Sequence, residues 1–526
     1  MRLIRKLPSC HQITIHLLSF LFLMSFISCS QKREINFPAT DLSEAALIPK
    51  PLEVAPTNGG FPLDKHTIIR VEDTIEGFKE VADFLAKKIQ SKTGLNIPVS
   101  QENKASSVIN IRSERLKYEN KEAYEIRITQ DTIDLIAHTS KGAFWGVQTL
   151  RQLIPYSAND TLAHHKIWVV PTGTIKDAPQ FSYRATMLDV SRHFFEADYI
   201  KEYISLLAYY KINVLHLHLT DDQGWRIEIK SWPKLTELGG STEVGGGPGG
   251  FYTQKQYKEI VAHAKSHHIT IVPEVDMPGH TNAAIVSYPF LNGTDQTPEL
   301  YTGKEVGFST FDTRKDTVYA FINDVVREIT MLSPGPYFHV GGDESHVTKK
   351  EDYIYFINRV EKIVQKYGKQ MIGWDEIANA DLDSNSVAQF WWHTENIETA
   401  ISKGMKTILS PANKTYLDMK YDSTTHIGYN WAGYIPVDSA YNWHPESYAP
   451  TENILGIDAP LWSETISTTD ELEYLAFPRL IGYAELGWTI QENRSWSDYK
   501  RRLALQAKFL EQMEVNYYRS SLIDWE

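Results

Sequence analysis

The sequence predicts an α/β fold: a (β/α)8 TIM barrel preceded by a small α+β domain. The chain has 526 residues, which exceeds one typical domain and suits two. From about residue 180, short β-rich runs alternate with helical runs, as parallel strands and their crossover helices do. Proline and aspartate at 171–179 mark a boundary before that change. We therefore expect the small domain over 48–178 and the barrel over 179–526.

The barrel prediction depends on finding eight strands in about three hundred residues. Helical periodicity between the strands is clearest at 198–210, 253–267, 316–332 and 351–367. The stretch 412–453 is then a long loop between strands seven and eight, and its many Tyr and Trp residues indicate a role at the barrel mouth. The strands are expected near 183–189, 212–219, 269–275, 336–341, 369–374, 386–392, 406–410 and 454–462.

The small domain contains both helical and strand patterns. Apolar spacing over Val81–Ile89 is helical. Ala123–Thr129 and Thr132–His138 alternate apolar and polar residues around a two-residue turn, which predicts a hairpin. Helical periodicity returns over Ser140–Leu153, with Ser140 as the expected N-cap.

The N-terminus has the features of an export signal. Basic residues precede an apolar stretch at 13–27 that is too short to span a bilayer comfortably. That stretch ends in FISC at 26–29, which resembles a bacterial lipobox and makes Cys29 the expected lipidation site. We expect a lipoprotein signal peptide over 1–29 and a polar tether over 30–47. The alternative is an ordinary secretory signal in which Cys29 is incidental.

Composition narrows the functional classes. The net charge of −13 argues against nucleic acid as the main partner, because phosphate binding needs a basic surface. Both cysteines, Cys10 and Cys29, lie in the first thirty residues. The two predicted domains therefore have no disulfide, thiolate nucleophile or cysteine-bound metal. We expect an exported protein, in the periplasm or on the outer membrane or cell surface, that contacts membrane through the lipid on Cys29.

Charged and aromatic residues gather at the ends of the predicted barrel strands. In a TIM barrel the C-terminal strand ends form the active site. Together these ends predict a polar, aromatic pocket for a polyhydroxy substrate. The segments are LDVSRH at 188–193, HLTDDQGW at 218–225, EVDMPGH at 274–280, HVGGDE at 339–344, WDE at 374–376 and LWSE at 461–464.

The adjacent carboxylates Asp343 and Glu344 carry the most chemical information. A regular strand would send neighbouring side chains to opposite faces. The two preceding glycines permit a turn that brings both to the mouth. Two neighbouring carboxylates disfavour double ionisation, so one pKa should rise, which suits a general acid beside a charged stabiliser. An isolated Gly-Gly-Asp-Glu segment is also compatible with a solvated acidic loop.

Seven blocks in order resemble family 20 glycoside hydrolases, the β-N-acetylhexosaminidases. The resemblance covers roughly 48–500 and includes the accessory-domain segments IPKP at 48–51 and GAFWGVQTLRQLI at 142–154. It implies a TIM barrel that removes terminal GlcNAc or GalNAc. The seven blocks are MLDVSRHF at 187–194, LHLHLTDDQGWR at 215–226, PEVDMPGH at 273–280, HVGGDE at 339–344, GWDE at 373–376, YLDMKYD at 416–422 and LWSE at 461–464.

The resemblance also implies catalytic roles. Glu344 is expected to protonate the glycosidic oxygen and then to activate water. Asp343 is expected to hold the acetamido N–H and to stabilise an oxazolinium intermediate, and Tyr416 to donate its hydroxyl to the acetamido oxygen. Such substrate-assisted catalysis departs from the usual two-carboxylate scheme. An oriented intramolecular nucleophile can act at an effective molarity of about 10⁵–10⁸ M.

The remaining site residues are also assigned through the resemblance. On a strand only one of Trp391 and Trp392 can point inward, and Trp391 is preferred. The aromatic pocket is expected to be Trp374, Trp391 and Trp462. The partners of the sugar hydroxyls are expected to be Arg192, Asp418 and Glu464. Asp221 and His280 match a pair that orients Glu344. No cofactor or metal is implied, and N-acetylhexosamine-terminated glycans are the expected partners.

Three other functions are compatible with parts of the sequence. Release of a disaccharide, as by a lacto-N-biosidase, would suit an open mouth around 412–453. A non-catalytic glycan-binding lipoprotein would not need the set formed by Asp343, Glu344 and Tyr416. A metal-dependent hydrolase is suggested by His216 and His218, which lie on one strand face ahead of two aspartates.

Overall fold

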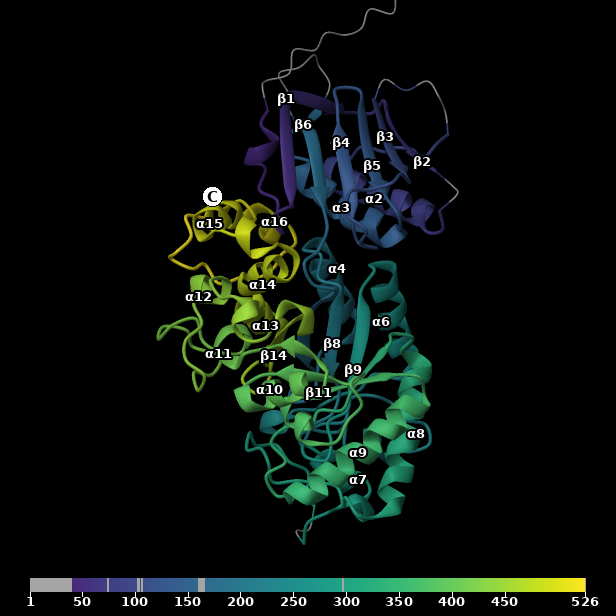
Figure 1. Ribbon diagram of the computed structural model, residues 1–526, viewed down its shortest axis with the longest axis vertical. Coiled ribbons are helices and arrows are strands. Elements are labelled where there is room, and N and C mark those ends of the chain that lie inside the picture. The colour runs from purple at the N-terminus through teal and green to yellow at the C-terminus, as the bar shows by residue number, and fades with distance from the viewer. Residues whose placement is uncertain are drawn as a thin grey trace, which may run out of the picture.

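The computed structural model describes residues 40–525 except 73–74, 102–104, 106, 159–165 and 296–297. The segment 1–29 and its expected lipidation site Cys29 lie outside the described residues. Figure 1 shows a small domain above a larger barrel, with the C-terminal helices α15 (Trp496–Ala504) and α16 (Ala507–Gln512) beside the small domain. No helix in the described part of the chain has the length and apolar character that crossing a membrane requires.

The small domain is a six-stranded mixed sheet carrying two helices. Its strand order is β1-β6-β4-β5-β3-β2. The predicted hairpin is confirmed, because β4 pairs with β5 in antiparallel register. The second predicted helix is also confirmed, although its N-cap is Thr139, whose hydroxyl accepts the Gly142 N–H. The elements are β1 (Glu53–Leu63), β2 (Thr67–Val71), α2 (Phe78–Thr93), β3 (Ser107–Arg112), β4 (Tyr124–Ile128), β5 (Thr132–Ala137), α3 (Ser140–Leu153) and β6 (Trp168–Asp177).

The predicted tether is wrong over residues 40–47. Leu42 and Leu47 are buried in the core. The carbonyl of Leu47 accepts a hydrogen bond from Arg502 at 2.7 Å, and that of Ala46 accepts one from Gln506 at 2.8 Å. This segment is therefore folded against the C-terminal helices, because its few apolar residues gain more from burial than from exposure.

Eight parallel strands close into the predicted barrel, in the order β10-β11-β12-β13-β14-β7-β8-β9. The helices α4 (Ala197–Tyr209), α6 (Gln254–Ser266), α8 (Asp316–Leu332) and α9 (Lys350–Lys366) cover its outside (Figure 1). The strands are β7 (Tyr183–Asp189), β8 (Val214–His218), β9 (Thr270–Glu274), β10 (Tyr337–His339), β11 (Gln370–Trp374), β12 (Val387–Phe390), β13 (Lys406–Leu409) and β14 (Ile454–Leu461).

Buried polar contacts join the two domains at the N-terminal ends of β7 and β8. Glu122 of the small domain contacts Arg184 at the start of β7 at 2.6 Å. Asp177 accepts hydrogen bonds from Lys211, just before β8, at 3.0 Å and from the Trp488 indole at 2.9 Å. The small domain thus lies away from the C-terminal strand ends, where a TIM barrel builds its active site.

Candidate active site

A cavity of about 660 Å³ opens where the C-terminal ends of the barrel strands meet. Its walls come from loops that follow β7, β10, β12, β13 and β14, together with the loop near residue 305. The lining residues are Arg192, Lys304, Glu305, Val306, Asp343, Glu344, Trp391, Trp392, Tyr416, Asp418, Tyr429, Trp431, Trp462 and Glu464. Most site residues predicted from the sequence are therefore brought together here.

A tight turn after β10 presents both carboxylates to this cavity. Gly341 and Gly342 have φ values of 66° and 99°, and Glu344 also has a positive φ of 45°. A Cβ on Gly341 would lie 1.9 Å from Asp276 Oδ1, so a side chain does not fit there. The turn removes the strand alternation that would otherwise point Asp343 and Glu344 to opposite faces.

The two carboxylates have different surroundings. The Asp343 side chain is 10% exposed and that of Glu344 is 30% exposed. Burial, reinforced by the neighbouring Glu344, raises the pKa of Asp343 to about 6, although His280 opposes the shift. A pKa rise of the kind expected for this pair is thus found at Asp343, the more deeply buried member.

His280 connects the carboxylate pair to a buried polar network. Its Nε2 lies 3.7 Å from both Asp343 Oδ2 and Glu344 Oε2, and its Nδ1 lies 3.1 Å from Asp221 Oδ1. Burial disfavours the imidazolium, but Asp221 and Asp343 outweigh it and raise the pKa of His280 well above its usual value. His218 Nε2 lies 2.7 Å from the second oxygen of Asp221. A charged His280 thus faces both Asp343 and Glu344. This position agrees with the expectation from the family resemblance that His280 lies beside Glu344.

Buried polar atoms without hydrogen-bond partners surround the cavity. Among the described residues they include Nε of Arg192, Oδ1 of Asp418 and Oε2 of Glu464, whereas Nη1 of Arg192 makes an ion pair with Asp189 at 3.5 Å. Arg192 is held by Asp221 at 2.8 Å, and its guanidinium lies 4.9 Å from the Trp462 ring centroid. Buried polar groups are nearly always paired. This set of donors and acceptors is suited to a ligand that carries several hydroxyl groups.

Aromatic rings form another part of the wall. Trp391 and Tyr416 stack with centroids 6.4 Å apart and planes 17° from parallel. The Trp391 indole donates to Glu376 at 3.2 Å, and Trp462 lies 6.3 Å from Tyr416. Burial raises the pKa of Tyr416 well above its usual value, so its hydroxyl stays a donor.

Trp374 is the predicted aromatic residue that the structure does not bring to the cavity wall. Its side chain has no exposed surface, and its indole donates to Glu274 at 3.0 Å. The ring lies 5.7 Å from Trp462, below the cavity. As the last residue of β11 it fills the barrel interior, where strand side chains pack in layers.

Six cavity residues were not predicted from the sequence: Lys304, Glu305, Val306, Trp392, Tyr429 and Trp431. Trp392 shares the cavity with Trp391 because β12 ends at Phe390, so strand alternation no longer applies. The aromatic density of 412–453 was the available signal for Tyr429 and Trp431. Nothing in the pattern around 304–306 indicated a site.

The paired histidines behind the metal-hydrolase alternative lie inside the barrel. His216 contacts Glu274 and Asp458, each at 3.0 Å, and His218 contacts Glu274 at 2.7 Å. Neither imidazole is exposed and neither lines the cavity. Their contacts are those of a buried hydrogen-bond network.

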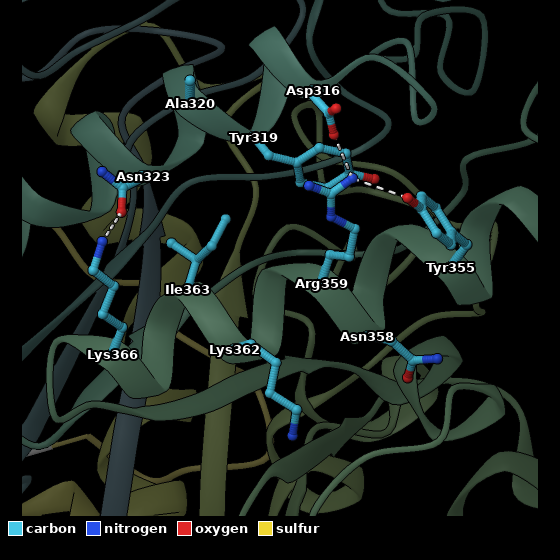
Figure 2. Close-up of a pocket in the computed structure, with 10 residues that line it drawn as sticks. All are labelled: Asp316, Tyr319, Ala320, Asn323, Tyr355, Asn358, Arg359, Lys362, Ile363 and Lys366. Carbon is cyan, nitrogen blue, oxygen red and sulfur yellow. Dashed lines mark hydrogen bonds and ion pairs between the residues drawn. The ribbon is translucent and has the colours of Figure 1, made fainter.

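A second hollow, about 690 Å³, lies on the outside of the barrel between α8 and α9. Figure 2 shows the Arg359 guanidinium between Asp316 and Tyr355, and Lys366 directed at Asn323. The Arg359 guanidinium also lies 3.6 Å from the Tyr319 ring centroid. Because these cations are already engaged and lie far from the strand ends, this groove is not an active-site candidate.

Comparisons with known proteins agree with this geometry. The model of the glycosyl hydrolase family 20 catalytic domain matches residues 181–491, and that of family 20 domain 2 matches 44–178. A beta-N-acetylhexosaminidase of Cellulomonas fimi is 36% identical, over 92% of this chain and 98% of that protein.

Solved structures show the same fold and family. The family 20 beta-N-acetylhexosaminidase of Streptomyces coelicolor is 44% identical with a TM-score of 0.88, covering 93% of this chain and 100% of that one. A mutant Streptomyces plicatus beta-hexosaminidase in complex with its product GlcNAc is 44% identical with a TM-score of 0.87, covering 93% and 99%. Sequence, fold and cavity agree, and the chain belongs to glycosyl hydrolase family 20.

Proposed function

We propose that this family 20 β-N-acetylhexosaminidase removes terminal, non-reducing β-linked GlcNAc or GalNAc by substrate-assisted catalysis. One observation carries the proposal. Asp343 and Glu344 both face one cavity whose other walls offer a protonated tyrosine, indole faces and unpartnered polar atoms. This combination suits a sugar with several hydroxyls and one acetamido group.

The reaction starts with the substrate's own acetamido oxygen as nucleophile. Asp343 accepts the acetamido N–H and, as a carboxylate, stabilises the positive charge of the oxazolinium ion. Tyr416 donates its hydroxyl to the acetamido oxygen. Glu344 protonates the leaving glycosidic oxygen as the C1–O bond breaks, and then takes a proton from the water that opens the oxazolinium ring. Two inversions at C1 retain the configuration, and no enzyme carboxylate bonds to that carbon.

The unpartnered polar atoms hold the rest of the sugar. Arg192 offers Nε, and Asp418 and Glu464 each offer one carboxylate oxygen. Burial raises the pKa of Asp418 well above its usual value, with the nearby Glu464 as the second cause. A sugar hydroxyl can donate to either carboxylate and accept from the guanidinium, which satisfies atoms that are otherwise buried without partners.

The aromatic wall divides the cavity into two regions. Trp391, Trp462 and Tyr416 enclose the part next to the carboxylate pair and suit the acetamido methyl group and the sugar face. Trp392 and Trp431, which are about half exposed, form the rim with centroids 5.6 Å apart. Trp374 packs behind this region, and we propose that it supports Trp462 from below rather than contacting the glycan.

The test is hydrolysis of 4-nitrophenyl N-acetyl-β-glucosaminide beside the matching β-glucoside, each with and without GlcNAc-thiazoline and EDTA. We expect cleavage of the acetamido substrate only, inhibition by the thiazoline and no effect of EDTA. Equal cleavage of the β-glucoside would rule out acetamido participation. Loss of activity on chelation would restore the metal-hydrolase hypothesis. Cleavage of a lacto-N-bioside but not of the monosaccharide substrate would favour disaccharide release.

We further propose that the mature chain is anchored by a lipid on Cys29, in the periplasm or on the outer membrane or cell surface. The lipobox-like segment FISC at 26–29 after a short apolar stretch supports this. Metabolic labelling with a palmitate analogue should mark the parent chain but not Cys29→Ala. Equal labelling of both, or of neither, would contradict the anchor.

A further inference from the structure

Asp276 is a buried acid next to the carboxylate pair for which the reaction above has no use. It lies just beyond β9 (Thr270–Glu274), after Val275, and is 1% exposed. Its backbone N–H donates to the Thr220 hydroxyl at 3.1 Å, and its Oδ1 accepts the Gly342 N–H at 3.0 Å. Its other oxygen, Oδ2, is buried without a hydrogen-bond partner among the described residues.

The neighbouring Asp343 also has one buried oxygen, Oδ1, that has no hydrogen-bond partner in the described part of the chain. Oxygens of Asp276 and Asp343 and a ring nitrogen of His280 all lie within 4.8 Å of one another. Two ionised carboxylates are both acceptors and cannot satisfy each other. A single proton held between them gives each unpartnered oxygen a partner.

The surrounding charges indicate which acid holds that proton. Asp343 and Glu274 face Asp276 with negative charge, and His280 and His218 face it with positive charge. Burial, followed by the charge of Asp343, raises the pKa of Asp276 well above its usual value. Burial raises the pKa of Asp343 to about 6, a smaller effect because His280, 3.7 Å from Asp343 Oδ2, opposes it. The proton therefore belongs on Asp276 and the negative charge on Asp343.

We propose that Asp276 is a positioning residue that stays protonated and donates its carboxyl hydrogen to Asp343, fixing that carboxylate's orientation towards the cavity. The Gly342 N–H determines which oxygen of Asp276 carries the proton, because it donates to Oδ1 and leaves the proton to Oδ2. A neutral acid also avoids a second negative charge beside Asp343, so that Asp343 can ionise in the working enzyme. The inference rests on the role proposed for Asp343 at the acetamido group.

The kinetic test compares Asp276→Asn with Asp276→Ala. In Asp276→Asn the Gly342 N–H should still donate to the side-chain oxygen. The amide NH2 then takes the place of Oδ2 and donates to Asp343, as the carboxyl proton does in the parent. We expect Asp276→Ala to lower kcat about 10- to 100-fold through loss of a hydrogen bond to a charged group. Asp276→Asn should recover most of that loss and remain within about threefold of the parent. A kcat for Asp276→Asn as low as that for Asp276→Ala would show that a charge is needed at 276 and would overturn the proposal.

Infrared difference spectroscopy supplies a measurement that does not depend on turnover. The parent minus Asp276→Asn spectrum should contain the carbonyl band of a protonated carboxyl group at neutral pH. Its absence would overturn the proposal even if Asp276→Ala failed to fold. Failure of the role proposed for Asp343 has a different result: Asp343→Asn would keep full activity while the infrared band at Asp276 could still be present.

Discussion

Replacing Asp343 by asparagine should make the protein more stable at neutral pH while abolishing most activity. Because the pKa of Asp343 is raised from 3.8 to about 6, the folded chain holds this proton more tightly than the unfolded chain does. The stability that the proton provides is complete below about pH 4 and is lost as the pH rises through about 6. At about 1.4 kcal/mol per pKa unit, burying the ionised carboxylate costs about 3 kcal/mol at pH 7.

Asp343→Asn removes this cost, so its thermal midpoint should exceed that of the parent by a few degrees at pH 7.5. Near about pH 3, below both the unfolded and the folded pKa, Asp343 is largely protonated in both states and the difference should nearly vanish. Thermal unfolding at both pH values measures this, with Asp524→Asn at an exposed position as the matched control. A gain of the same size at both pH values, or a lower midpoint at pH 7.5, would refute the reasoning.

Other predictions concern catalysis. Glu344→Gln should lower kcat on chitobiose by about 10²–10⁴-fold, with exposed Glu452→Gln unchanged, and near-normal turnover would exclude the general-acid role. Tyr416→Phe should lower kcat about 10- to 100-fold through loss of its donor, whereas a change confined to KM would argue against the proposed contact. In the parent, kcat/KM should fall as the pH drops through about 6, because Asp343 must be ionised; a profile flat to pH 4 would contradict this. Trp431→Ala should raise KM for chitobiose about three- to tenfold by removing an exposed stacking face, and an unchanged KM would remove the rim from substrate binding.

The sequence predicted the architecture well because most residues of the barrel strands are buried. The expected strand 183–189 coincides with β7, since apolar runs bounded by helical patterns leave little freedom. The expected strand 336–341 is longer than β10, which ends at His339 where the chain turns through Gly341 and Gly342. The sequence pattern thus predicted this strand correctly but not the residue at which it ends.

Site residues that directly follow a barrel strand could be predicted from the sequence, whereas those on loops remote from the strands could not. Strand ends and the family resemblance located Asp343 and Glu344 correctly at the barrel mouth. The loop at 304–306 lies on no strand, so no periodicity could place it in the cavity. Asp276 was visible as an acid at a strand end, but its relation to Asp343 exists only in three dimensions.

The buried contacts between the small domain and the N-terminal end of the barrel couple the unfolding of the two domains. Arg184 and Lys211 are almost completely buried and take their carboxylate partners, Glu122 and Asp177, from the small domain. Separating the domains would leave two cations and the Trp488 indole without those partners, which is costly in a dry interior. The barrel therefore depends on the small domain for cooperative unfolding, and heat should melt both in a single calorimetric transition.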